Sequence, residues 1–98
     1  MITSKQRAYL RAMANTMETI LIVGKGGISA EVIKQADDAL TAREILKGKV
    51  LETAEENVRE IATFLADKTH ADIVQIIGTK FVLYRKNNKN PQIILPKK

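Results

Sequence analysis

A segment of three glycines and one lysine, Gly24-Lys25-Gly26-Gly27, combines residue types that could hold a phosphate group. It follows an apolar run that ends at Val23, and it precedes Ser29, a residue type that caps helices. The first turn of a helix has unpaired backbone N–H groups and a partial positive charge, and glycines let an anion approach these groups closely. Lys25 would add a full charge. A plain strand-to-helix turn would use the same glycines, so this sequence segment alone leaves both interpretations open.

The two best-known nucleotide-binding loops do not match this segment. A Walker A loop would need a glycine where Thr19 stands, and a serine or threonine where Gly26 follows the lysine. The dinucleotide fingerprint G-x-G-x-x-G fails because Ser29 occupies the position of its last glycine. The shorter pattern G-x-x-G remains, and in KH domains such a loop holds a nucleic-acid backbone. A small nucleotide-binding protein is therefore only an alternative.

The sequence offers little for catalysis or metal binding. The chain has no cysteine, which excludes disulfides, thiolate nucleophiles and thiolate metal sites. His70 is the only histidine, and with Asp72 it would give two ligands on one strand face, which is too few for a zinc site. No nucleophile can be combined with a base and an orienting group. We therefore expect no enzyme, and no catalytic residue, metal or cofactor.

Positive charge is unevenly distributed along the chain. The 98 residues include 16 lysines and arginines against 11 acids, a formal net charge of +5 at pH 7. Residues 1–17 and 80–98 contain no acid, whereas acids gather between residues 52 and 72. This polarity indicates a polyanion as partner, with nucleic acid ahead of a membrane surface. A basic surface without any partner and a basic face that docks an acidic protein are the alternatives.

The first half of the chain predicts two helices around one strand. Thr3 and Gln6 match a capping box that begins a helix. The apolar run 19–23 is rich in β-branched residues and predicts a strand buried on both sides, hence central in its sheet. Ser29 is the expected N-cap of the second helix.

The second half predicts a strand, a helix and a hairpin. Residues 43–51 alternate between lysines and apolar residues and predict a half-buried strand with the lysines on one side. Thr53 and Glu56 match a second capping box. Gly78-Thr79 suits a two-residue type II′ turn, with the glycine first.

Together these elements predict a single α/β domain over residues 1–98. The order α-β-α-β-α-β-β predicts two layers with a mixed four-stranded sheet. Residues 86–98 look like a loosely organised basic tail, in which 92–95 could add a short edge strand. No apolar run approaches the roughly 18 residues of a membrane span, and the polar first residues do not resemble a secretory signal. We therefore expect a cytoplasmic monomer that does not enter a membrane.

Four blocks of the sequence, in order, resemble the YhbY-like CRM domain proteins, a family named for chloroplast RNA splicing and ribosome maturation. The blocks are QRAYLRAMA, VGKGGIS, EILKGKVL and VQIIGTKFVLYR, and the similarity runs from about Thr3 to Leu95. The resemblance implies RNA binding and a fold like the C-terminal domain of translation initiation factor three. Stand-alone bacterial and archaeal members associate with precursors of the large ribosomal subunit. The resemblance therefore implies ribosomal RNA and pre-ribosomal particles as partners of this protein.

Three positions depart from the pattern of the family. Asn15 stands in a region where relatives often have a histidine, and Thr19 stands where a proline often precedes the first strand. Gly48 occupies a position where a β-branched residue is common, and a glycine weakens a strand locally. None of these departures removes a charge or a loop glycine.

The expected RNA contacts come from the glycine loop, the first helix and the second strand. The resemblance places the family's G-x-x-G loop on residues 24–27 and its basic helix on the cations before residue 12. The strand lysines either extend this surface or are simply solvated, and Arg85 with Lys86 forms either a second contact or a solubilising end. The full candidate set is Gly24, Lys25, Gly26, Gly27, Ser29, Lys5, Arg7, Arg11, Lys34, Lys47 and Lys49.

Aromatic residues are too few to stack bases on the sheet. Phe81 and Tyr84 are three residues apart on the last strand and therefore fall on opposite faces, so at most one of them faces solvent. We expect phosphate and shape recognition to dominate over base stacking.

Overall fold

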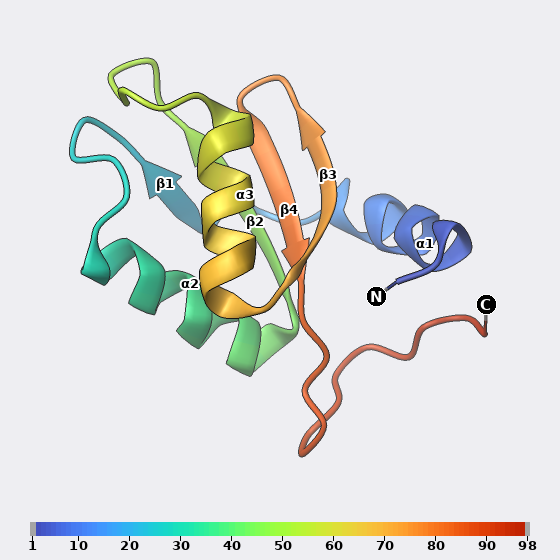
Figure 1. Cartoon of the computed structure of the whole chain (residues 1–98). Helices are drawn as coiled ribbons and strands as arrows, with labels where there is room; N and C mark the ends of the chain where they lie inside the picture. The colour runs from blue at the N-terminus through green and yellow to red at the C-terminus, as the bar shows by residue number, and fades with distance from the viewer. Residues whose placement is uncertain (1, 98) are drawn as a thin grey trace.

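The structure is a computed structural model and describes residues 2–97. Within that range the elements follow the predicted order α-β-α-β-α-β-β (Figure 1). Their bounds are α1 (Ser4–Ala14), β1 (Leu21–Val23), α2 (Ala30–Arg43), β2 (Ile45–Val50), α3 (Val58–Thr69), β3 (Asp72–Ile77) and β4 (Lys80–Tyr84).

The four strands form one mixed sheet in the order β1-β2-β4-β3, as predicted. β1 and β2 are parallel, and the other two pairs are antiparallel. The prediction of a central, fully buried strand at residues 19–23 was wrong, because β1 is a short edge strand. Ile22 on its outer face is 58% exposed, while Leu21 and Val23 on its inner face are buried. An apolar run cannot by itself distinguish a buried face from an exposed one.

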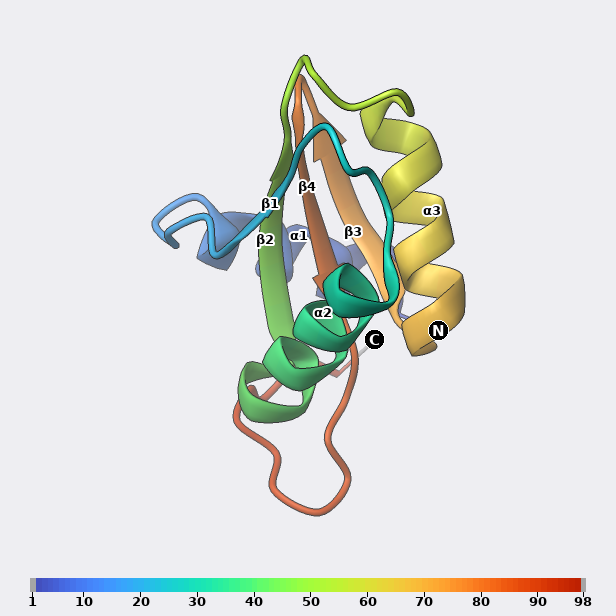
Figure 2. The same ribbon diagram turned by 90° about the vertical axis from the view of Figure 1, so that its left-hand side faces the viewer.

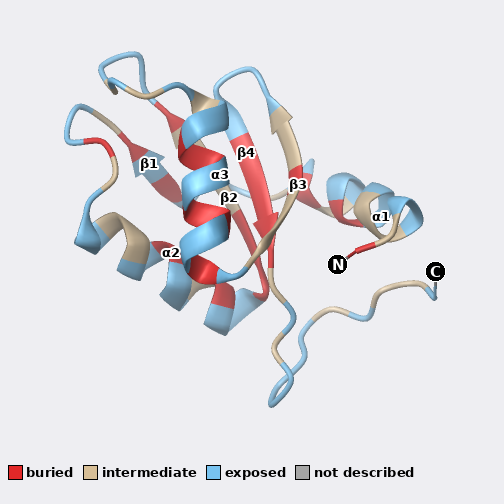
Figure 3. Ribbon diagram, viewed as in Figure 1, coloured by how far each residue is buried: buried red, intermediate tan, exposed pale blue. Residues whose placement is uncertain are grey.

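Each face of the sheet carries its own apolar cluster. α2 and α3 lie side by side on one face and α1 lies apart from them (Figures 1 and 2). The larger cluster joins α2 and α3 to the sheet, with Leu40, Leu65 and Phe81 fully buried in it, and the buried stripe of α3 faces the strands (Figure 3). The second cluster joins α1 to the other face. The sheet with α2 and α3 is thus the predicted two-layer unit, and α1 adds a partial cover behind it.

Local capping chemistry explains where the helices begin. The capping box of Thr3 with Gln6 and the N-cap Ser29 are both present, as predicted. The predicted box of Thr53 with Glu56 was wrong, because α3 begins after Asn57. The Asn57 side chain accepts the N–H of Glu60 at 2.9 Å, and the Glu60 carboxylate accepts the N–H of Asn57 at 3.2 Å. Turns and bends occupy the chain just before Asn57, so the cap signal of Thr53, four residues earlier, is not used.

Three connections gather at the upper end of the sheet in Figure 1. Leu51 donates its N–H to the carbonyl of Val23, and Val50 donates to the carbonyl of Thr79, both at 2.8 Å. The β3–β4 hairpin has Gly78 at φ +58° while Thr79 stays at negative φ, which agrees with the predicted type II′ turn. The glycine loop, the β2–α3 connection and this hairpin therefore share one end of the fold.

The chain after β4 is held by a buried carboxylate and forms no strand between residues 85 and 97, so the suggested edge strand at 92–95 was wrong. Glu44 is fully buried at the end of α2 with φ +67°. Its carboxylate accepts backbone N–H groups of Asn87, Gln92 and Ile93, each at 2.6 Å. Burial alone would raise the pKa of Glu44, but these donors, with the charge of Lys86, outweigh it and lower the pKa.

Candidate nucleic-acid interface

The glycine loop is a tight turn whose tip points to solvent. Gly27 donates its N–H to the carbonyl of Gly24 at 2.8 Å and has φ +60°. A Cβ at Gly27 would lie 2.7 Å from Oε1 of Glu56, so a side chain there would meet both backbone strain and a close contact. Gly26 has open space where its Cβ would be, and Lys25 is exposed. The loop therefore offers backbone and one ammonium group to a ligand at its tip.

One side of this loop is acidic. The Oε1 atom of Glu56 is buried against Gly27 and has no hydrogen-bond partner among the described residues. Ser29 already uses its hydroxyl oxygen to accept the N–H of Val32 at 3.2 Å, which occupies one donor of the first helical turn. A phosphate would therefore be repelled on the α3 side of the loop and would approach from the side of Lys25 and Gly26.

The cations of α1 lie on another part of the molecule. α1 packs on the face opposite α2 and α3, and Arg7 donates from Nε to the carbonyl of Ile73 in β3 at 3.3 Å. β3 and β1 are opposite edges of the sheet, so this contact is separated from the loop by the width of the sheet. Lys5 and Arg11 are exposed on α1. The structure therefore does not gather the first-helix cations around the glycine loop.

The two lysines of β2 differ in their surroundings. Lys47 donates from Nζ to the carbonyls of Ala14 at 2.9 Å and Met17 at 3.3 Å, so it holds the end of α1. Lys49 is half-buried on the same face of the sheet, two residues further along β2. Lys49 is consequently the better placed of the two for a ligand.

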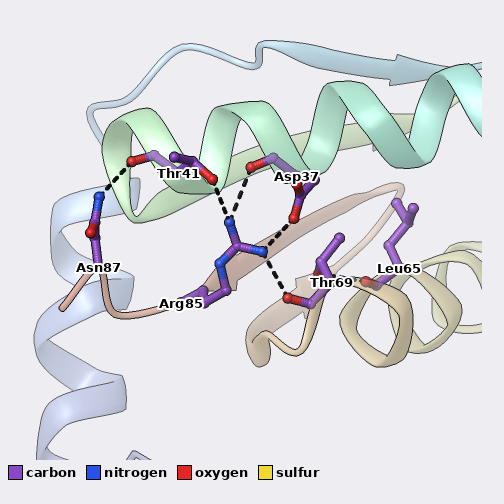
Figure 4. Close-up of polar contacts among 6 residues, drawn as sticks. All are labelled: Asp37, Thr41, Leu65, Thr69, Arg85 and Asn87. Carbon is purple, nitrogen blue, oxygen red and sulfur yellow. Dashed lines mark hydrogen bonds and ion pairs between the residues drawn. The ribbon is translucent and has the colours of Figure 1, made fainter. Parts of the chain in front are cut away.

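Two candidate cations from the sequence are engaged with acids. Lys34 pairs with Asp38 at 2.9 Å on the exposed side of α2, and this hydrogen bond and charge raise the pKa of Lys34. Arg85 donates to the Asp37 carboxylate at 2.6 Å, to the Thr41 hydroxyl at 2.7 Å, and to the backbone carbonyls of Thr69 and Asp37 (Figure 4). Arg85 therefore joins α2, α3 and the end of β4, a role that neither sequence interpretation included.

The aromatic residues offer no stacking platform on the sheet. Phe81 is buried in the α2–α3 cluster and Tyr84 in the α1 cluster, on opposite faces as expected. Tyr9 and Phe64 are partly exposed, but they lie on helices in different layers, and Lys68 lies 5.4 Å from the Phe64 ring centre. Within residues 2–97, no aromatic side chain of the sheet is exposed.

Charge is separated between the two layers of the fold. Residues 30–44 and 51–70, which make up the two-helix layer and its entry loop, contain nine acids and four lysines or arginines, a net charge of −5. All other residues contain two acids and twelve lysines or arginines, a net charge of +10. Five of these twelve cations belong to residues 85–98, after β4. The other seven lie on α1, the glycine loop and the strands, where two acids leave a net charge of +5. These elements are therefore positive overall, and the two-helix layer is negative.

Sequence reasoning missed Lys80 as a site residue, although this exposed cation is the residue paired with Lys49 across β2 and β4. Only the strand register could have revealed the pair. His70 caps the end of α3 at φ +59° and lies outside β3, so the suggested strand pair with Asp72 was wrong. Among the described residues no three metal-ligating side chains gather, and no helix is long and apolar enough to cross a membrane.

A small α/β domain with a positively charged sheet side and a G-x-x-G loop is the kind of module that binds nucleic acid. The sequence pattern of the CRS1 / YhbY (CRM) domain matches residues 2–85, and the chain belongs to this family.

Relatives match over nearly the whole chain. The chain is 42% identical over 96 residues to a Bacillus subtilis protein named "Probable RNA-binding protein YqeI", covering 98% of this chain and 100% of that one. It is 30% identical to a Haemophilus influenzae protein named "RNA-binding protein", with coverage of 99% and 97%. The solution structure of Staphylococcus aureus protein SAV1595 is similar with a TM-score of 0.81 and 42% identity, covering 98% of this chain and 100% of that one.

Proposed function

We propose that this protein is a cytoplasmic RNA-binding protein without enzymatic activity, and that its target is ribosomal RNA in precursors of the large ribosomal subunit. The separation of charge carries this proposal, because α1, the glycine loop and the strands have a net charge of +5 while the two-helix layer has −5, and this polarity presents one defined surface to a polyanion. Membership of the CRM family and the names of the relatives support RNA as that polyanion. The ribosomal target rests on the resemblance of the four sequence blocks.

In this mechanism the loop tip holds one phosphate, and the cations of α1 and of the strands hold other phosphates of the same RNA. Backbone N–H groups near Gly26 would donate to phosphate oxygens, and Lys25 would supply charge. The acidic side of the loop at Glu56 would keep RNA away from the helical layer. If about four to six phosphates are neutralised, log Kd should depend on log salt with a slope of about 0.7 to 0.9 per phosphate.

The experiment that tests the loop is a charge reversal with a matched control. Lys25→Glu with Gly26→Asp should weaken binding to ribosomal RNA fragments and lower the salt slope. The unfolding transition should stay unchanged, since both positions are exposed and a Cβ at Gly26 would meet open space. Arg59→Glu with Thr63→Asp makes the same change in charge on exposed positions of α3. This control pair should bind RNA as the unmodified protein does. The proposal would be contradicted if both double variants lost the same RNA affinity, or if the loop variant lost none.

Two further measurements address the target and the alternatives. Crosslinking to RNA in cells, with the crosslinked nucleotides identified, should enrich one region of the large-subunit ribosomal RNA. Co-purification with ribosomal particles should disappear after nuclease treatment, whereas docking to an acidic protein would survive it. Thermal stabilisation by a mononucleotide would favour a nucleotide-binding protein instead.

A further inference from the structure

One row of paired residues crosses all four strands at the end of the sheet where the glycine loop lies. The register places Ile22 of β1 beside Lys49 of β2, Lys49 beside Lys80 of β4, and Lys80 beside Ile77 of β3. Their neighbours along the strands, such as Val23 and Phe81, belong to the α2–α3 cluster, so the row points to the opposite face.

This row is open to solvent because α1 covers only the other part of that face. Ile22 and Ile77 are 58% and 62% exposed, and Lys80 is exposed as well. The side chains of the α1 cluster, such as Tyr84 and Val74, lie further from the loop end of the sheet. A band with apolar ends and a cationic middle is therefore accessible across the full width of the sheet.

The stability of the fold does not explain this band. Like charges directly opposite each other on neighbouring strands are destabilising, and Lys49 and Lys80 form such a pair. Within residues 2–97 the two ion pairs are Lys34 with Asp38 and Arg85 with Asp37, so no acid compensates the two lysines. A bound polyanion would supply the missing negative charge.

A hollow of about 210 Å³ adjoins the band and is walled by the end of α1. Asn15 lines it from the α1 side, and Gln75, Ile77 and Lys80 line it from β3 and β4. Helical spacing places Arg11 four residues before Asn15 on the same side of α1. The hollow therefore brings two amide groups, the ammonium groups of Lys80 and Lys47, and apolar side chains together at the edge of the band, with Lys47 already donating to carbonyls at the end of α1.

We infer that the band Ile22-Lys49-Lys80-Ile77 and the adjoining hollow form a second RNA-binding surface that takes the backbone of an RNA duplex. Lys49 and Lys80 bind phosphates, the isoleucines pack against ribose, and Asn15 and Gln75 hydrogen-bond to 2′-hydroxyl groups. Duplex RNA is recognised by its shape through phosphates and 2′-hydroxyls, whereas single strands are held by exposed aromatics that this sheet lacks among the described residues. The inference rests on the proposed function.

The decisive variant is Lys80→Glu, because it should weaken RNA binding without lowering the stability of the fold. The new carboxylate would pair with Lys49 and remove the repulsion, so the melting temperature should rise or stay equal. Affinity for a short ribosomal RNA duplex should fall about tenfold, and the salt slope should fall by about one. Lys89→Glu makes the same charge change at an exposed position of the tail and should leave the affinity within about twofold of the unmodified protein.

The apolar part of the band has its own test. Ile22→Thr with Ile77→Thr keeps residues that favour strands but removes apolar surface, and it should weaken duplex binding without changing the salt slope. Ile94→Thr is the control, because Ile94 is 89% exposed in the tail. Equal affinity of the double variant and the control would overturn the role of the isoleucines.

The outcomes separate this inference from the proposed function. If the unmodified protein binds no RNA, both fail together. If the loop pair loses RNA while Lys80→Glu keeps duplex affinity, only the second surface is wrong. If Lys80→Glu weakens the binding of single-stranded RNA but leaves duplex binding unchanged, the assignment to a duplex is wrong. If Lys80→Glu weakens the binding of a polyglutamate peptide but leaves duplex binding unchanged, the band is a docking site for an acidic protein instead.

Discussion

Gly48 on β2 lies directly opposite Phe81 on β4, and the ring of Phe81 occupies the space where a Gly48 side chain would be. A Cβ built on Gly48 would lie 2.3 Å from the ring atom Cζ. The sequence suggested that this glycine weakens the strand. In the structure it instead makes room for the largest fully buried side chain of the α2–α3 cluster.

Gly48→Ala should therefore destabilise the protein by about 1–3 kcal/mol, because the added methyl group overpacks the core. A glycine replaced by alanine at an unstrained, open position would be neutral or slightly stabilising, since it restricts the unfolded chain. Gly26→Ala is such a position and serves as the control. Urea unfolding of both variants measures the difference.

A second substitution identifies the cause. Adding Phe81→Leu to Gly48→Ala should cost less than the sum of the two single changes, because the smaller side chain relieves the contact. Strict additivity of the two unfolding free energies would show that the ring and the glycine do not interact as described.

Glu44 should make the stability of the tail depend on pH. Its lowered pKa means that the carboxylate stabilises the fold above the ordinary value of 4.5 and that this contribution is lost as the pH falls below it. Glu44→Gln should cost about 1–3 kcal/mol at pH 7, because an amide NH₂ group would face a backbone N–H donor. Melting temperatures measured from pH 7 to pH 3 should show the two proteins converging at the acidic end.

The exposed Glu52 provides the control for this titration, since Glu52→Gln should follow the unmodified protein at every pH. A constant difference between Glu44→Gln and the unmodified protein over the whole range would mean that the Glu44 charge is not responsible.

Arg85 should matter for stability and not for RNA. Arg85→Gln removes the charged hydrogen bonds to α2 and α3 and should lower the unfolding free energy by about 1–3 kcal/mol. Lys86→Gln, at the exposed neighbouring position, should have little effect on stability. RNA affinity of folded Arg85→Gln should equal that of the unmodified protein at a temperature well below its transition. If Arg85→Gln binds RNA more weakly but unfolds in urea as the unmodified protein does, Arg85 contacts RNA and is not a structural residue.

Features that depend on neighbouring residues in the sequence could be predicted, and features that depend on long-range pairing could not. The caps at Thr3 and Ser29 and the turn at Gly78 are local chemistry, and all three are present. The edge position of β1 depends on which strands pair, and an apolar run is the same sequence in either place. The start of α3 was missed because Thr53 offers a cap signal of the same type as Asn57, and the turns between them decide which is used.

The candidate site shows the same division. The glycine loop could be found because glycine, lysine and an N-cap follow each other in the chain. The band could not, because Ile22 and Ile77 are 55 positions apart and are aligned in one row across the sheet only by the strand register. The roles of Arg85 and Lys47 were also hidden, since each depends on carbonyls from a distant helix end.

Glu56 should reduce the affinity of the glycine loop for phosphate. Its Oε1 atom lies where a Cβ of Gly27 would meet it, so a full negative charge stands beside the proposed phosphate site. Glu56→Gln keeps the shape and removes the charge, and it should raise RNA affinity about two- to threefold at low salt, with the gain shrinking as salt screens the charge. Asp67→Asn removes a charge at an exposed position near the other end of α3 and should change affinity much less. Fluorescence anisotropy with one RNA at several salt concentrations compares the three proteins. A Glu56→Gln protein that binds no better than Asp67→Asn at low salt would mean that RNA does not approach the loop closely enough to sense this carboxylate.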